Sequence, residues 1–175
     1  MESNRLAEYI EKMASLAFRF LLVFFAGGVV LTSSWGALSQ PPSGVVIFSK
    51  ETVSIISGAK THEFQVELAL TPQQHMQGLM FRQRLGVDAG MLFVYRREAP
   101  IAMWMKNTYL PLDMLFISRG GIISKIAERT VPLSEMTISS GVAVIAVLEL
   151  NSGTVSRLGI TLGDKVIASS LGIVR

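Results

Sequence analysis

The sequence predicts a mainly β domain of the α+β class, an antiparallel barrel or sandwich of about eight short strands with one or two short helices. From residue 45 onward, short apolar segments alternate with turn signals as far as the C-terminus. The pattern lacks the long amphipathic helices that a doubly wound α/β fold requires. A composition of 50% hydrophobic and 17% charged residues indicates a compact globule and excludes a disordered chain.

A signal peptide or membrane segment is predicted at residues 1–39. The uncharged run FLLVFFAGGVVL directly follows Arg19, and the small residues after it offer cleavage spacing. This pattern indicates an exported chain, periplasmic or secreted. A spanning helix needs about twenty apolar residues, so an uncleaved anchor in the inner membrane is the alternative. Met13 is an alternative start, because it gives a shorter segment before the apolar run.

The remainder of the chain is expected to hold one domain. Residues 40–59 would form a linker and a lead-in strand, residues 60–168 the β-rich domain, and residues 169–175 a C-terminal tail. The first clear strand is EFQVELAL at 63–70, where apolar and polar residues alternate. That alternation predicts a strand with one face in water.

A short helix is predicted directly after this strand. Thr71 suits the N-cap, Pro72 suits the first helical position, and Gln74 stands at capping-box spacing. Gly78 limits the helix to about two turns. MLFVY at 91–95 follows as a strand that is apolar on both faces, which indicates an interior position.

The remaining elements are predicted from apolar runs and from the turn residues between them. A loop is expected at 132–140. The other elements are strands at 101–107, 112–118, 122–127, 142–150 and 160–168, and one helical turn at 154–159.

Composition excludes several functional classes. The chain has no cysteine, which rules out disulfides, thiolate nucleophiles and Cys-based metal sites. Its formal charge of +3 is scattered, so no nucleic-acid partner is expected. His62 and His75 are the two histidines, with His75 expected on the exposed side of the short helix. HExxH, GxxxxGK[ST], GxGxxG and GxSxG patterns are missing, so we expect no metal and no cofactor.

Polar residues interrupt the apolar, methionine-rich stretch at 103–114. In an extended strand Trp104 and Lys106 share one face, so a solvated Lys106 keeps Trp104 near water and forgoes roughly 4–6 kcal/mol of burial. A hairpin loop at 108–111 would set Lys106 opposite Asp113. This register predicts a charged pair at the rim of a pocket. A surface pair worth about 0–1 kcal/mol is the structural alternative.

Two further acidic residues are candidates. Glu149 ends the apolar run at 142–150, where a carboxylate is costly unless it is paired or hydrogen-bonded. It suits either a structural partner or a site residue. Asp164, in LGDKV, has the sequence context of a turn residue.

Five sequence blocks, in this order, resemble the domain of unknown function 192 family across about residues 60–168. They are GLMFRQRL (78–85), GMLFVY (90–95), MWMKNTYLPLDMLFI (103–117), VLELNSG (147–153) and LGITLGDKV (158–166). The resemblance implies a compact, mostly β domain, often exported in bacteria, with no established reaction. Without cysteine, a lipoprotein anchor is excluded. The family's polar positions would fall on Arg82, Lys106, Asn107, Asp113, Glu149 and Asp164, with Trp104 beside them.

We expect non-catalytic binding of an envelope-associated small molecule, glycan or polypeptide. Membrane contact is expected only through an uncleaved N-terminal segment. Arg82 and Lys106 would anchor anionic groups, and Trp104 would stack on the ligand. The alternatives are a cofactor-independent hydrolase or lyase with Asp113 and Glu149 as acid and base, and a purely structural envelope protein. The expected ligand-binding residues are Arg82, Trp104, Lys106, Asn107, Asp113 and Glu149.

Overall fold

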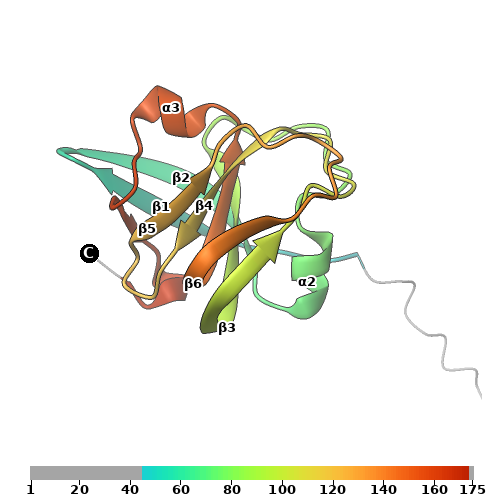
Figure 1. Cartoon of the computed structure of the whole chain (residues 1–175), viewed down its shortest axis with the longest axis horizontal. Helices are drawn as coiled ribbons and strands as arrows, with labels where there is room; N and C mark the ends of the chain where they lie inside the picture. The colour runs from blue at the N-terminus through green and yellow to red at the C-terminus, as the bar shows by residue number, and fades with distance from the viewer. Residues whose placement is uncertain (1–44, 174–175) are drawn as a thin grey trace, which may run out of the picture. The chain divides into compact units, whose positions relative to one another are not determined.

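A single curled β-sheet forms the body of the domain (Figure 1). The computed structural model describes residues 45–173, and all of them fall in one compact unit. The segment expected at 1–39 and the linker up to residue 44 lie outside the described residues. Within 45–173, no helix is long and apolar enough to cross a membrane.

The sheet has seven strands in the order β5-β4-β6-β3-β2-β1-β7. The strands are β1 (Ser49–Ser57), β2 (Lys60–Ala69), β3 (Ala89–Met103), β4 (Leu112–Ile117), β5 (Ile123–Ala127), β6 (Ile138–Asn151) and β7 (Lys165–Ile167). The helical elements are α2 (Pro72–Gln77), α3 (Thr154–Leu158) and the 3-10 turn η1 (Ser169–Leu171).

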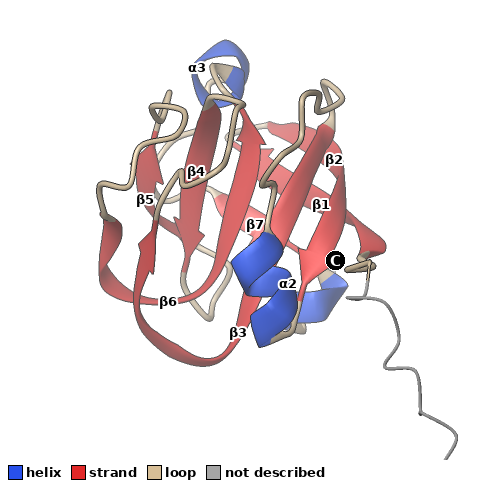
Figure 2. Ribbon diagram, turned by 90° about the vertical axis from the view of Figure 1, so that its right-hand side faces the viewer, coloured by secondary structure: helices blue, strands red, loops and turns tan. Residues whose placement is uncertain are grey.

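The two edge strands of the sheet, β5 and β7, come together at one end. Ile122 forms an isolated antiparallel bridge with Lys165, and the Ile123 N–H donates to the Asp164 carbonyl oxygen at 2.9 Å. The sheet is therefore a curled half-barrel whose edges meet at this point. Figure 2 shows the curl of the sheet from the side.

Residues 90–93 of β3, all of β4 and residues 144–150 of β6 are buried on both faces of the sheet. Leu92, Leu115 and Leu148 belong to one apolar cluster, whereas Met91 and Met114 belong to a second cluster on the opposite face. All six residues of β4 are buried. Burial on both faces explains why these strands appear in the sequence as continuous apolar runs.

The local signals located several elements correctly. At α2 both halves of the capping box form: Thr71 Oγ1 accepts from the Gln74 N–H at 3.2 Å, and Gln74 Oε1 accepts from the Thr71 N–H at 3.0 Å. The predicted helical turn is α3. In β2, Phe64 and Val66 are buried as the alternation predicted.

Longer-range expectations needed correction. The strands predicted at 91–95 and 101–107 are one 15-residue strand, β3, which has register shifts between Val94 and Ala99 and between Pro100 and Ala102. The predicted hairpin with its loop at 108–111 does not form, because β6 lies between β3 and β4 in the sheet.

The all-antiparallel expectation fails at one pairing. β2 and β3 are parallel, with Gln65 opposite Ala89. Parallel neighbours need a crossover connection, and the segment that carries α2 provides it. The sheet is otherwise antiparallel, with seven strands where about eight were predicted.

Gly90 is required where β3 and β6 approach each other. A Cβ at this position would lie 2.5 Å from the Glu149 carbonyl oxygen and 2.8 Å from Leu150 Cδ2. We expect Gly90→Ala to lower the free energy of unfolding by about 3 kcal/mol, because backbone must move to relieve the overlap. Urea unfolding measures the change.

Gly120 provides the matched control, since a Cβ there meets nothing within 4 Å. Gly120→Ala should leave the stability within about 0.5 kcal/mol of the wild type. Equal effects at the two positions would contradict the close approach of β3 and β6.

Candidate functional site

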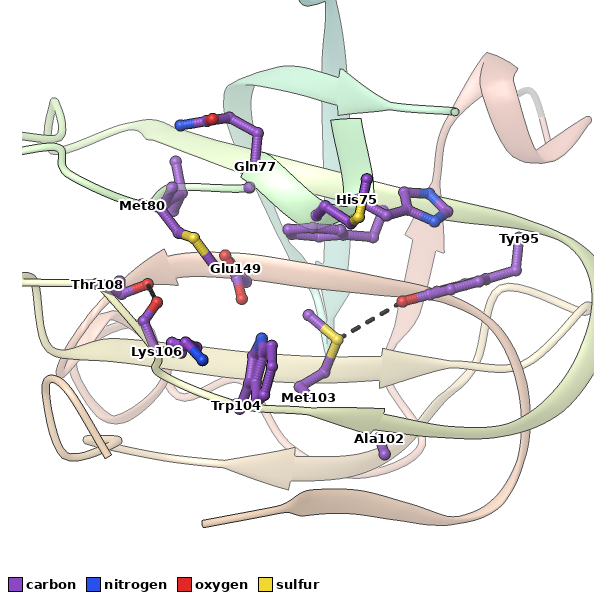
Figure 3. Close-up of a pocket in the computed structure, with 14 residues that line it drawn as sticks. His75, Gln77, Met80, Tyr95, Ala102, Met103, Trp104, Lys106, Thr108 and Glu149 are labelled. Carbon is purple, nitrogen blue, oxygen red and sulfur yellow. Dashed lines mark hydrogen bonds between the residues drawn. The ribbon is translucent and has the colours of Figure 1, made fainter. Parts of the chain in front are cut away.

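A pocket of about 280 Å³ lies beside α2 (Figure 3). Its walls come from α2 and the turn after it, from β3 and the loop that follows, and from β6. The lining residues are His75, Met76, Gln77, Gly78, Leu79, Met80, Phe93, Tyr95, Ala102, Met103, Trp104, Lys106, Thr108 and Glu149.

Glu149 places a carboxyl group at the inner wall of the pocket. β6 pairs it with Met91 of β3 and Met114 of β4, both fully buried, so the side chain stands in an apolar layer. Glu149 is 4% exposed, and its carboxyl points into the space between Met80 and Trp104 (Figure 3). Burial raises the pKa of the carboxyl to about 8. Among residues 45–173, no donor forms a hydrogen bond to it.

Tyr95 and His75 form the adjoining wall. The Tyr95 hydroxyl donates to Met103 Sδ at 3.5 Å, and burial, with the charge of Glu149 as a second cause, raises the pKa of Tyr95 to about 12. The His75 ring centroid lies 4.7 Å from that of Tyr95, and its Nε2–H donates to the Ala69 carbonyl oxygen at 2.9 Å. His75 is therefore packed into the pocket wall, and the expectation of an exposed position was wrong.

Trp104 and Lys106 form the outer rim. Their shared face is confirmed: Trp104 is 49% exposed, Met105 between them is buried, and Lys106 Nζ lies 5.1 Å from the Trp104 ring centroid. Lys106 Nζ also lies 3.8 Å from Glu135 Oε1. The Lys106 ammonium therefore already has an aromatic and an anionic partner.

Asp113 lies on the opposite face of the sheet. β4 sets it against Leu150, which belongs to the first apolar cluster, whereas Glu149 shares the face of Met114 in the second cluster. Its carboxylate is fully buried and accepts from the Arg129 N–H at 2.9 Å and the Val155 N–H at 3.0 Å. Asp113 therefore anchors α3 and the loop after β5, and it does not meet Lys106 or Glu149.

Arg82, Asn107 and Asp164 are not lining residues of the pocket, although the Asn107 amide lies 3.9 Å from Sδ of the lining residue Met80. Arg82 forms a bidentate ion pair with Glu67, at 2.7 and 2.6 Å, which lowers the pKa of Glu67. The carbonyl oxygen of Asn107 accepts from the N–H of Phe81 at 2.8 Å. Asp164 Oδ2 accepts from a backbone N–H three residues earlier, at 2.8 Å, so its assignment as a turn residue is confirmed.

Arg82 lines a second cavity of about 400 Å³ that borders the first. The two cavities share Gln77, Gly78 and Met80. The guanidinium group of Arg82 also lies 5.8 Å from the centroid of the Phe48 ring. The structure thus brings Trp104, Lys106 and Glu149 to one pocket and leaves the other predicted site residues outside it.

Strained backbone occurs in several loops, and two of the positions adjoin pocket residues: Phe81 follows Met80, and Asn107 lies between Lys106 and Thr108. Phe81, Asn107, Arg129 and Leu133 are the non-glycine residues of 45–173 with positive φ, between 53° and 63°. Two of the loops are tied by the Leu133 N–H, which donates to the Thr108 carbonyl oxygen at 3.1 Å. Such conformations cost about 1–3 kcal/mol each and cluster at functional sites. Phe81 and Leu133 are moreover 56% and 55% exposed.

The sequence prediction missed several pocket residues, among them His75, Met80, Tyr95 and Thr108. Tyr95 had a usable signal, because its hydroxyl ends a strand that is apolar on both faces and therefore needs a partner. The other residues had no comparable signal in the sequence.

These features define a half-barrel domain with a pocket beside α2 that is lined by the buried carboxyl group of Glu149. The family model of the domain of unknown function 192, described as Uncharacterized ACR, matches residues 53–168, and the chain belongs to this family. No curated protein matches the chain significantly.

Two crystal structures are similar to this chain. One is a candidate transcription regulator from Sinorhizobium meliloti 1021, with 50% sequence identity and a TM-score of 0.71 over 73% of this chain and 99% of the other. The second is a protein of unknown function from Novosphingobium aromaticivorans DSM 12444, with 34% identity and a TM-score of 0.66 over 80% and 99% of the two chains. The half-barrel is thus shared with relatives in two bacteria.

Replacing Asp113 tests its structural role. Asp113→Asn leaves one acceptor oxygen for two backbone N–H donors and turns an amide NH2 toward one of them. We expect a loss of about 2–3 kcal/mol in the free energy of unfolding. In Asp164→Asn the single accepted bond can be kept, so the loss should stay below about 1 kcal/mol. Urea unfolding compares them, and a larger loss at Asp164 would contradict this assignment.

The burial of Glu149 predicts a pH-dependent stability. The carboxyl of an unfolded chain ionises near 4.5, whereas the folded pKa is about 8. Between these values the unfolded state has lost the proton and the folded state retains it, so stability falls as pH rises. The slope is about 1.4 kcal/mol per pH unit. Glu149→Gln carries no such proton, so its stability relative to wild type should increase from about pH 5 to about pH 8.

Urea unfolding at several pH values measures this difference. Glu128→Gln, at an exposed position outside the pocket lining, is the control for the loss of one surface carboxyl group. A Glu149→Gln difference that stays constant with pH would show that this carboxyl is not protonated in the folded state.

Proposed function

We propose that this chain is an exported, non-catalytic binding domain that takes a small ligand, or one group of a glycan or polypeptide, into the pocket at Glu149. The observation that carries the proposal is a carboxyl group that is 4% exposed, points into a cavity and receives no hydrogen bond from residues 45–173. The carboxyl group lines the pocket, so a ligand there can form the hydrogen bonds that residues 45–173 do not supply.

The remaining walls suit recognition of a small apolar surface. Trp104 presents an exposed ring at the rim, Met80 and Met103 provide adaptable thioether contacts, and the Tyr95 hydroxyl is a second polar group. A volume of about 280 Å³ is near the lower end of small-molecule sites, which start at about 300 Å³. This size favours a small molecule or a single sugar or side-chain group.

The proposed export, to the periplasm or out of the cell, rests on the apolar N-terminal run and on the small residues at cleavage spacing after it. An uncleaved anchor would instead hold the domain at the inner membrane. The Sinorhizobium protein is described as a transcription regulator. This chain has a net charge of +3 that is scattered along the sequence and forms no basic stripe for DNA phosphates, so we do not propose DNA binding for it.

The hydrolase or lyase alternative needs Asp113 and Glu149 at one substrate. The two carboxyl groups lie on opposite faces of the sheet, and both oxygens of Asp113 accept backbone hydrogen bonds. This geometry favours binding at Glu149 and a structural role for Asp113.

A ligand screen by thermal unfolding tests the proposed function. The compounds are defined sets of sugars, alkyl carboxylates, alkyl alcohols, alkyl amines and short peptides. We expect at least one class to stabilise the wild type, by about 2.7 kcal/mol at a hundredfold excess over its dissociation constant. Glu149→Gln should lose most of this gain, because the group that anchors the ligand is changed.

Glu128→Gln is again the control and should respond as the wild type does. The proposal fails if no class stabilises the wild type. It fails equally if every stabilising compound acts on Glu149→Gln to the same extent.

A further inference from the structure

We infer that the group taken by this pocket is an alkylammonium, held between the Glu149 carboxylate and the face of Trp104. The inference rests on the proposed function and names the chemical class of its ligand.

Glu149 is the titratable pocket residue whose carboxyl group has neither an ion pair nor a hydrogen bond from residues 45–173. The titratable groups that face the cavity are His75 from α2, Tyr95 from β3, Lys106 from the following loop and Glu149 from β6. Lys106 has Glu135 and the Trp104 ring as partners, and His75 and Tyr95 donate to neighbouring atoms. The ionised carboxylate of Glu149 is therefore available to a cationic ligand.

The walls favour an organic cation. An ammonium binds over an aromatic face within about 6 Å of the centroid, and tryptophan binds best. Lys106 Nζ occupies such a position at 5.1 Å from the Trp104 centroid. The Trp104 ring thus binds the Lys106 ammonium, and the ring is still 49% exposed, with Glu149 just inside it (Figure 3).

The same walls disfavour a hard metal ion. Calcium and magnesium need about six or more oxygen ligands, whereas the pocket offers one carboxylate among thioethers and rings. Within 45–173, no group of three or more His, Cys, Asp and Glu residues could hold a metal ion.

An anionic ligand is the competing possibility, and it predicts the opposite dependence on pH. A carboxylate ligand would accept from protonated Glu149 and from Lys106, so its affinity would fall as Glu149 ionises. An ammonium needs ionised Glu149, so its binding releases a proton. Below about pH 8 its dissociation constant should fall about tenfold per pH unit.

Calorimetric titrations separate these possibilities. Butylammonium, butyrate and butanol share one alkyl chain and differ in charge, so they are titrated into the full chain at about pH 6, 7 and 8. We expect butylammonium to bind most tightly and to gain about tenfold in affinity per pH unit. Glu149→Gln should lose at least about tenfold and all of the pH dependence, while Glu128→Gln matches the wild type.

Titrations with two peptides distinguish a lysine side chain of a polypeptide from a free amine as the source of the ammonium. Acetyl-Gly-Lys-Gly-amide carries the ammonium on a side chain, and acetyl-Gly-norleucine-Gly-amide lacks it. Tighter binding of the lysine peptide than of butylammonium indicates a polypeptide ligand, whereas weaker binding indicates a free amine. Either result keeps the alkylammonium class.

Other outcomes overturn the inference. Butyrate or butanol binding more tightly than butylammonium at every pH removes the ammonium class but leaves a ligand site at Glu149. Butylammonium affinity that is unchanged in Glu149→Gln places the contact elsewhere. If neither these compounds nor any class of the wider screen binds, the proposed function fails together with the inference. Unfolding of Glu149→Gln in urea verifies that the variant is folded.

Discussion

Burial of the second half of β6, residues 144–150, on both faces is the constraint on which the rest of the structure depends. The strand pairs with β3 along one edge and with β4 along the other, and its alternate residues enter two different apolar clusters. Every residue from 144 to 150 is buried. A carboxyl group at position 149 must therefore stand in an apolar layer, and its pKa rises because the charged form loses hydration. Pairing along both edges also fixes where that carboxyl points.

Local signals predicted the elements well, because they act over a few residues. The capping box at Thr71 and the alternation in β2 depend on neighbours in the chain, and both formed as expected. Strand order depends on which distant segments pair, and this information is not local. The insertion of β6 between β3 and β4 therefore separated Lys106 from Asp113, although a hairpin loop was compatible with the sequence between them.

The candidate site was predictable where a residue type conflicted with its surroundings. Glu149 in an apolar run and Trp104 on the same face as Lys106 were both costly arrangements, and both belong to the pocket. Asp113 also lies in an apolar stretch of the sequence, but its carboxylate accepts hydrogen bonds from the backbone N–H groups of residues 129 and 155. Every residue except proline has such a donor, so sequence alone could not distinguish a structural carboxylate from a ligand-binding one. His75 entered the pocket because α2 rests against β3, a contact that no local pattern encodes.

The meeting of the two sheet edges has a consequence for the order of folding. β7 follows every other strand in the chain, and it covers β1 while its neighbour Asp164 reaches β5. Until residues 164–167 have been synthesised and docked, the strands β1 and β5 expose unpaired backbone groups that can pair with another chain. A nascent chain of this topology gains from being shielded until synthesis has passed that point, and a chaperone that holds it unfolded would provide such protection.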